Sequence, residues 1–160
     1  MKAIIVYDNT AYIKELKASW GFSCLIEAYN KKILFDTGGS GAILQYNMRK
    51  LNIDVKEFTD IFISHNHSDH TGGLPAILKE NSHAKLWIPA SMPTIQTVNQ
   101  AVKVKEPIEL YEGIYSTGEL NGVEQSLCIK TGKGIVVIVG CAHSKVENIL
   151  NTASKFGEVY

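Results

Sequence analysis

The feature that most constrains this chain is a run of histidines and one aspartate directly after a short apolar segment. Residues 60–63 (Asp-Ile-Phe-Ile) read as a buried strand, and residues 65–70 (His-Asn-His-Ser-Asp-His) follow almost at once. Protonated imidazoles this close repel one another, and turns are normally built from Gly, Asn, Asp, Ser or Pro. Three of the chain's five histidines within this segment therefore indicate a site for a divalent cation.

The spacing within the cluster divides its side chains between two positions. His65 and His67 are two residues apart, so in an extended segment they share a face and can bind one ion together. Asp69 and His70 are adjacent and diverge unless the backbone turns between them, which favours a second ion beside the first. Imidazole suits zinc, and carboxylate with imidazole also admits iron or manganese. We expect one or two divalent ions, with zinc as the first choice.

A further histidine follows another apolar strand. Residues 135–139 are apolar throughout, which predicts a place in the centre of a sheet, and Gly140-Cys141-Ala142-His143 comes next. Because open α/β sheets place their sites at the carboxyl ends of strands, we expect His143 beside His65 and His67. Three imidazoles and a water form a catalytic arrangement, since structural zinc sites are closed. Zinc-bound water supplies hydroxide near neutral pH, and Asp69 is the candidate catalytic residue that orients it.

The rest of the chain reads as one α/β domain over residues 1–160, with an N-terminal half of about 1–105 and the start of a C-terminal half at about 106–160. Strands are expected at 2–7, 22–28, 32–35, 60–63, 86–88, 108–111, 114–116, 123–130 and 134–139. Helices are expected around 44–51, after Gly73, over 94–104 and behind His143. Ser144 and Glu147 form a capping-box pattern at the start of the last of these helices.

Composition and charge exclude several classes of protein. The 16 Lys and Arg residues balance 16 Asp and Glu residues, and a net charge of zero argues against a nucleic-acid partner. No apolar run approaches the roughly 20 residues that cross a bilayer, which argues against a membrane protein. Asp8 comes too early for a secretory signal. The three widely spaced cysteines form no disulfide framework, so we expect reduced thiols, a cytoplasmic protein and a small buried Cys141.

Three motifs, in order, resemble those of the metallo-β-lactamase superfamily. Residues 65–70 match its H-x-H-x-D-H signature, Asp36-Thr37-Gly38 resembles its first motif, and residues 140–143 resemble its third. The resemblance implies an αββα sandwich in which Asp36 supports the metal loop without binding metal. It also implies a set of metal ligands: His65, His67, Asp69, His70 and His143. With residues 20–23 added, the motifs are similar to the metal-dependent hydrolase branch that includes the archaeal dihydropterin–ribofuranosylaminobenzene phosphate synthases.

The chain also departs from this pattern. Members of the family are usually longer and carry a further histidine near the C-terminus that binds the second metal, whereas no His or Asp lies between His143 and Tyr160. We therefore expect a complete first site, a second site with only Asp69 and His70, and a sandwich whose second half is incomplete. The open sheet edge must then be covered. Three explanations fit this departure from the family pattern: a truncated product, completion by another chain or by self-association, and a mononuclear enzyme. We favour truncation.

Three functions remain open on the sequence alone. The first is a zinc-dependent hydrolase acting on a small ester, thioester, lactam or phosphoester. The second is a pterin-pathway synthase of the same fold, and the third is a catalytically impaired metal-binding fragment that needs a partner chain. For a small-molecule substrate, Ser144 and Trp20 are candidate contacts, although helix capping and core packing are the alternatives.

Overall fold

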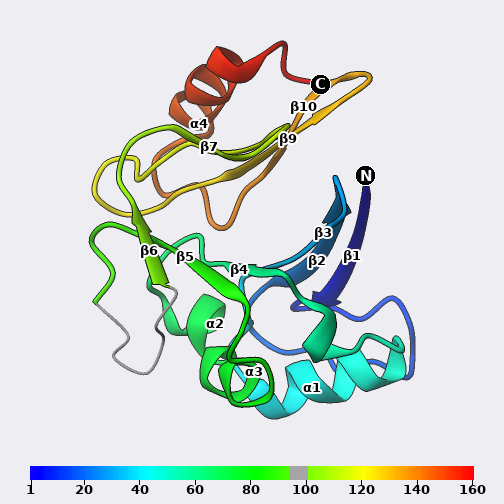
Figure 1. Ribbon diagram of the computed structural model, residues 1–160. Coiled ribbons are helices and arrows are strands. Elements are labelled where there is room, and N and C mark those ends of the chain that lie inside the picture. The colour runs from blue at the N-terminus through cyan, green and yellow to red at the C-terminus, as the bar shows by residue number, and fades with distance from the viewer. Residues whose placement is uncertain (94–100) are drawn as a thin grey trace.

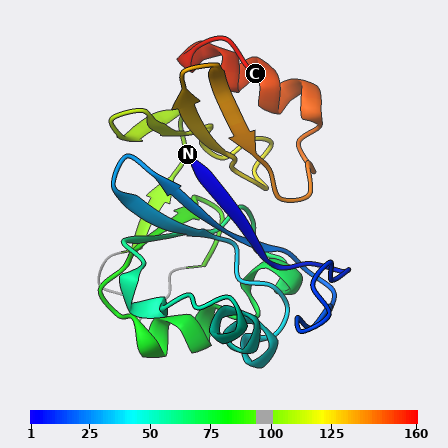
Figure 2. The ribbon, with the colours of Figure 1, turned by 90° about the vertical axis from the view of Figure 1, so that its right-hand side faces the viewer.

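Two β-sheets packed face to face form the centre of the molecule (Figure 1). The computed structural model describes residues 1–93 and 101–160. Helices α1, α2 and α3 cover the outer face of the first sheet, and α4 covers the outer face of the second, as Figure 2 shows from the side. The chain therefore has the αββα sandwich that the sequence predicts.

The first sheet has the strand order β1-β2-β3-β4-β5-β6. Its strands are β1 (Lys2–Tyr7), β2 (Ser23–Ala28), β3 (Lys31–Phe35), β4 (Asp60–Phe62), β5 (Lys85–Pro89) and β6 (Ala101–Val104). The first three strands pair antiparallel, and β3 to β6 pair parallel. Because β3 and β4 run parallel, their carboxyl ends meet at one edge of the sheet, which brings Asp36 to the loop that begins at Ser64.

The second sheet has the order β10-β9-β8-β7 and is antiparallel throughout. Its strands are β7 (Ile108–Tyr111), β8 (Ile114–Ser116), β9 (Leu127–Thr131) and β10 (Gly134–Ile138). The prediction that β10 lies in a sheet centre is wrong, because among the described strands β10 is an edge strand of the second sheet. Its outer side pairs with the chain terminus through a bridge between Ile135 and Val159.

The helices are short. They are α1 (Gly41–Lys50), α2 (Ser68–Thr71), α3 (Leu74–Glu80) and α4 (Val146–Ala153), with 3₁₀ turns η1 (Val55–Glu57) and η2 (Ser154–Phe156). The helix predicted over 94–104 is wrong at its end, because residues 101–104 are β6 and pair parallel with β5. Its other residues, 94–100, lie outside the described residues. In the described part of the chain, no helix is both long and apolar enough to cross a membrane.

Strand β4 is buried on both faces, which is why its sequence is a continuous apolar run. Ile61 packs in the core between the first sheet and its helices, together with Leu44 and Met48 of α1. Phe62 packs in the core between the two sheets, where its ring stacks on Phe35 at a centroid distance of 5.5 Å. The end of β4 is therefore held rigidly, and it anchors the residues that follow it.

Candidate metal centre

The loop after β4 changes from extended backbone to helix within a few residues. His65 pairs with Glu124 in an isolated antiparallel bridge, and His67 is the N-cap of α2. The His70 N–H donates to the carbonyl of His67 at 3.0 Å, so Asp69 and His70 lie in the first turn of the helix. The helix supplies the backbone turn that lets these adjacent side chains both face the cluster.

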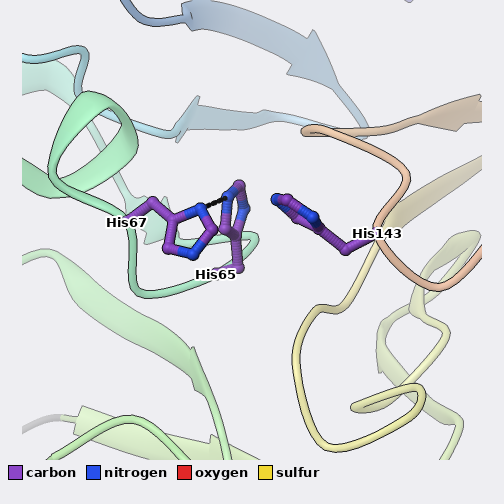
Figure 3. A group of neighbouring side chains, drawn as sticks. All are labelled: His65, His67 and His143. Carbon is purple, nitrogen blue, oxygen red and sulfur yellow. Dashed lines mark hydrogen bonds between the residues drawn. The ribbon is translucent and has the colours of Figure 1, made fainter.

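His65, His67 and His143 come together at the edge between the sheets (Figure 3). One ring nitrogen from each lies within 4.8 Å of the others, and His65 Nε2 lies 3.1 Å from His67 Nδ1. Two ring nitrogens that face each other at this distance need a shared proton or a cation between them. His65 is buried, but His67 and His143 are exposed, so the group is open to solvent on one side. Such an arrangement leaves room for water beside a bound ion.

Asp36 orients two of the imidazole rings from behind. Its Oδ1 accepts the Ser64 N–H at 2.7 Å, and its Oδ2 accepts the Ser64 hydroxyl at 2.7 Å and His70 Nδ1 at 2.6 Å. The Ser64 oxygen in turn accepts His65 Nδ1 at 2.9 Å. Because both Nδ1 atoms donate, the lone pairs of His65 and His70 are on Nε2, where an ion can bind them. Asp36 is fully buried, and hydrogen bonds to Ser64 and His70 occupy both of its carboxylate oxygens.

The electrostatic environment keeps His65 neutral at neutral pH. Burial, followed by the positive charges of His70, His67 and His143, lowers the pKa of His65 to about 3. Burial also disfavours the protonated ring of His70, but its hydrogen bond to Asp36 and the charge of Asp36 outweigh that effect and raise the pKa of His70. His65 can therefore bind a cation at neutral pH without first losing a proton.

A second group of donor atoms surrounds His70. Its Nε2 lies 3.1 Å from Cys141 Sγ and 3.5 Å from Asp69 Oδ2. One donor atom from each of His65, His70 and Cys141 lies within 4.8 Å of the others. The expectation of a buried Cys141 is wrong, because this cysteine is exposed. Its Sγ contacts His70, which lies in α2.

Glu124 is a residue of the centre that the sequence reasoning missed. It is fully buried, its Oε1 accepts the Ser144 N–H at 2.6 Å, and its Oε2 has no hydrogen-bond partner among the described residues. Because it pairs with His65 in an antiparallel bridge, its side chain lies on the same face as that of His65. No local motif marks Glu124, since its role depends on pairing with a loop far away in the chain.

The donor set fits a divalent cation. The imidazoles are surrounded by three carboxylates, those of Asp36, Asp69 and Glu124, and the first and last of these are fully buried. Buried carboxylates cost free energy unless a positive charge or hydrogen bonds compensate them, and one oxygen of Glu124 has no hydrogen-bond partner among the described residues. Imidazole with carboxylate or thiolate is a donor set for zinc and related metals.

Ser144 and Trp20, the candidate substrate contacts, lie in different environments. Ser144 is buried, and its hydroxyl donates to the Leu120 carbonyl at 2.9 Å. It does not cap α4, whose N-cap is Lys145, so the capping-box prediction is wrong. Trp20 is 73% exposed and lines a pocket of about 280 Å³ that also includes Asp69. Trp20 is therefore the better placed of the two to meet a molecule beside the metal centre.

Comparison with known sequences gives one matching family model, and among the relatives are two that align with nearly the whole of this chain. The family model described as the metallo-beta-lactamase superfamily matches residues 21–98. An uncharacterised protein of Methanocaldococcus jannaschii is 28% identical, over 97% of this chain and 75% of its own length. The 7,8-dihydropterin-6-methyl-4-(beta-D-ribofuranosyl)-aminobenzene-5'-phosphate synthase of the same organism is 26% identical, over 95% of this chain and 71% of its own length.

Solved structures with the same fold are similar at low sequence identity. A structure from Thermotoga maritima assigned to the metallo-beta-lactamases matches with a TM-score of 0.61 and 17% identity, over 86% of this chain and 77% of that one. The Rm3 metallo-beta-lactamase matches with a TM-score of 0.56 and 16% identity, over 84% of this chain. The chain spans 59% of the length of the Rm3 enzyme.

Proposed function

We propose that the chain, whose residues 21–98 match the metallo-beta-lactamase superfamily model, is a member of that superfamily and a zinc-dependent hydrolase acting on a small ester, thioester, lactam or phosphoester. The observation that carries the proposal is the convergence of His65, His67 and His143 on one solvent-accessible point. An ion bound there would supply Lewis-acid chemistry at neutral pH. The other chemical roles fall to side chains of this chain.

We assign the handling of protons to Asp69. Its Oδ2 lies 3.5 Å from His70 Nε2, and Asp69 also lines the pocket that Trp20 lines. A carboxylate in that place can accept a hydrogen bond from the attacking water at Oδ1 or Oδ2 and aim its lone pair at the substrate. It can then pass the proton to the leaving group. Trp20 offers an exposed aromatic face to the body of the substrate.

The test of the hydrolase proposal is metal content combined with turnover. Wild-type protein, His67→Ala and the exposed His83→Ala are loaded with zinc and assayed on generic aryl esters and phosphodiesters. We expect turnover by the wild type and His83→Ala and a loss of about 100-fold or more in His67→Ala, since one metal ligand is removed. A fully metal-loaded wild type that turns over none of these substrates would contradict the proposal.

A second candidate function is a pterin-pathway synthase. It is supported by the similarity to the Methanocaldococcus jannaschii synthase, which extends over 95% of this chain. Product formation from a pterin precursor and a ribosyl-aminobenzene phosphate separates the two candidates. If this product forms and the generic esters are left intact, the synthase replaces the hydrolase as the proposed function.

A further inference from the structure

The pocket that Trp20 and Asp69 line is bounded mainly by groups that can donate hydrogen bonds. Its volume is about 280 Å³, and Tyr7 lines it together with three hydroxyl-bearing side chains: Ser19, Ser40 and Ser68. Ser68 lies between His67 and Asp69 in the sequence, so the pocket adjoins the metal centre. Among the described residues that line it, Asp69 alone carries a charge.

Tyr7 brings a buried hydroxyl group to this pocket. The residue is 1% exposed, and its hydroxyl oxygen has no hydrogen-bond partner among the described residues. Its ring lies against Gly38, where an added Cβ would come within 2.6 Å of the ring carbons. The hydroxyl lies beside Gly39, 3.6 Å from the position of an added Cβ, and Gly39 lines the same pocket. Because a buried polar group without a partner costs free energy, this hydroxyl indicates a ligand that accepts a hydrogen bond from it.

Helix α1 begins at the same pocket. Its N-cap, Ser40, lines the pocket, and the Ser40 side chain makes no capping hydrogen bond. The first turn, residues 41–43, contains no acidic residue, and its N–H groups donate to no acceptor among the described residues. The positive end of the helix dipole is therefore uncompensated where it meets the pocket. A phosphate group can accept hydrogen bonds from N–H groups in this position.

We propose that this pocket binds a phosphate group of the substrate through the Tyr7 hydroxyl, the Ser40 hydroxyl and the N–H groups at the start of α1. The inference rests on the proposed function and names its substrate class: an ester that carries a phosphate group away from the bond that is cleaved. The Asp69 carboxylate, 3.5 Å from His70 Nε2, would repel a phosphate group, so the reacting bond belongs beside Asp69 and the phosphate among the donors. A phosphate group offers three terminal oxygens to these donors, whereas a carboxylate offers two.

Binding of methyl phosphate tests the pocket separately from the metal centre, because phosphate can also bind zinc directly. Zinc-loaded wild type, Tyr7→Phe and His67→Ala are titrated with methyl phosphate by calorimetry. We expect the dissociation constant to rise about 10-fold or more in Tyr7→Phe, which loses a hydrogen bond to a charged group, and to stay near the wild-type value in His67→Ala. The exposed Tyr12→Phe makes the same chemical change outside the pocket and should bind as the wild type does.

Three binding results would overturn the inference. Binding that is lost in His67→Ala and kept in Tyr7→Phe would place the phosphate on the metal ion. Acetate that binds the wild type as tightly as methyl phosphate does would contradict the choice of phosphate over carboxylate. Absence of binding to the wild type would remove the site altogether.

Unfolding measurements distinguish a hydroxyl that binds a ligand from one that stabilises the fold. Without phosphate, the free energy of unfolding of Tyr7→Phe should equal or exceed that of the wild type, because removal of an unpartnered hydroxyl breaks no hydrogen bond. With saturating methyl phosphate, the wild type should gain more stability than Tyr7→Phe does. A Tyr7→Phe chain that is less stable without phosphate would show that the hydroxyl has a partner within the protein, which contradicts the inference.

A matched pair of esters connects the pocket to turnover. The substrates are p-nitrophenyl esters of one hydroxy acid, with its hydroxyl either free or phosphorylated, and both are assayed with zinc-loaded protein. We expect the phosphorylated ester to have a KM about 10-fold lower at similar kcat in the wild type, and this difference to disappear in Tyr7→Phe. Equal KM values in the wild type would overturn the inference and leave the hydrolase proposal standing. Binding of methyl phosphate that depends on Tyr7, without turnover of either ester, would support the phosphate site and contradict the hydrolase proposal.

Discussion

Asp36 and His70 form a buried pair in which the ring Nδ1 donates to the carboxylate at 2.6 Å. The pair joins the end of β3 to helix α2, and the same carboxylate holds Ser64 and, through it, His65. Asp36 has a φ of 54°, in the left-handed region that a non-glycine residue rarely adopts. The structure maintains this strain because one carboxylate orients a ring in each of the two donor groups.

The Asp36→Asn variant tests this role. An amide keeps the shape but can accept at only one atom, so it cannot receive the Ser64 N–H on one side and both the Ser64 hydroxyl and His70 Nδ1 on the other. We expect metal affinity to fall about 10–100-fold, the range typical of residues that orient metal ligands. Chelator competition measures the affinity, with the exposed Asp54→Asn as a charge-matched control that keeps its capping bond. Equal affinities in the two variants would refute the role.

Gly140→Ala tests the close approach of the third motif to the loop after β4. The new methyl would lie 2.4 Å from the Ser64 oxygen, so the loop must move away. We expect the free energy of unfolding to fall by about 1–3 kcal/mol, as overpacking usually costs, together with weaker metal binding. Gly132→Ala is the matched control, because its added methyl meets nothing within 4 Å. Denaturant unfolding and metal titration of both variants give the comparison.

The residues of the centre divide into those that the sequence can reveal and those that it cannot. The histidine cluster and Asp69 lie within one short segment, and their density alone predicts a metal site. Cys141 contacts His70 across 71 residues, and Glu124 reaches the cluster only because it pairs with His65. Contacts of that kind depend on how two sheets pack, which no local pattern encodes.

Two predictions from local sequence patterns were wrong because residues far away in the sequence formed the contacts instead. Ser144 and Glu147 match a capping box, but the buried Glu124 carboxylate accepts the Ser144 N–H and the Leu120 carbonyl accepts its hydroxyl. In the same way, residues 101–104 join a sheet because β5 offers them a parallel partner. A short apolar segment does not distinguish helix from strand by its period alone.

The low pKa of His65 predicts how the metal-free chain responds to acid. Its pKa falls from 6.5 to about 3 on folding, chiefly through burial. The unfolded state therefore binds more protons between these values, and the free energy of unfolding should decrease as the pH falls from 6.5 towards 3. His65→Gln should show a shallower decrease than the wild type in urea unfolding with chelator present. Parallel curves for the two proteins would exclude a neutral, acid-sensitive His65.

Asp60 tests a contact between the two sheets at the amino end of β4, away from the metal centre. Its Oδ1 accepts Trp87 Nε1 at 2.8 Å and the Tyr111 hydroxyl at 2.7 Å. Asp60→Ala leaves both donors unpaired, and each unpaired buried group costs about 1–3 kcal/mol. We expect lower stability with unchanged metal affinity per folded chain. Tyr111→Phe, which removes one donor and leaves the acceptor paired with Trp87, should be the milder variant, and a larger loss there would contradict this assignment.

Glu124 combines two roles that a pair of variants can separate. Glu124→Ala leaves the buried Ser144 N–H without an acceptor, so we expect a loss of about 1–3 kcal/mol in stability and a displaced His143 loop. Glu124→Gln keeps an acceptor at Oε1 but removes the negative charge beside the donor groups. We expect it to fold with near wild-type stability and to bind metal more weakly, whereas the exposed Glu147→Gln should change neither quantity. Calorimetric titration with zinc and thermal unfolding measure the two effects. If Glu124→Gln binds zinc as tightly as the wild type does, the unpartnered oxygen of Glu124 does not contribute to holding the cation, and its role is limited to positioning Ser144.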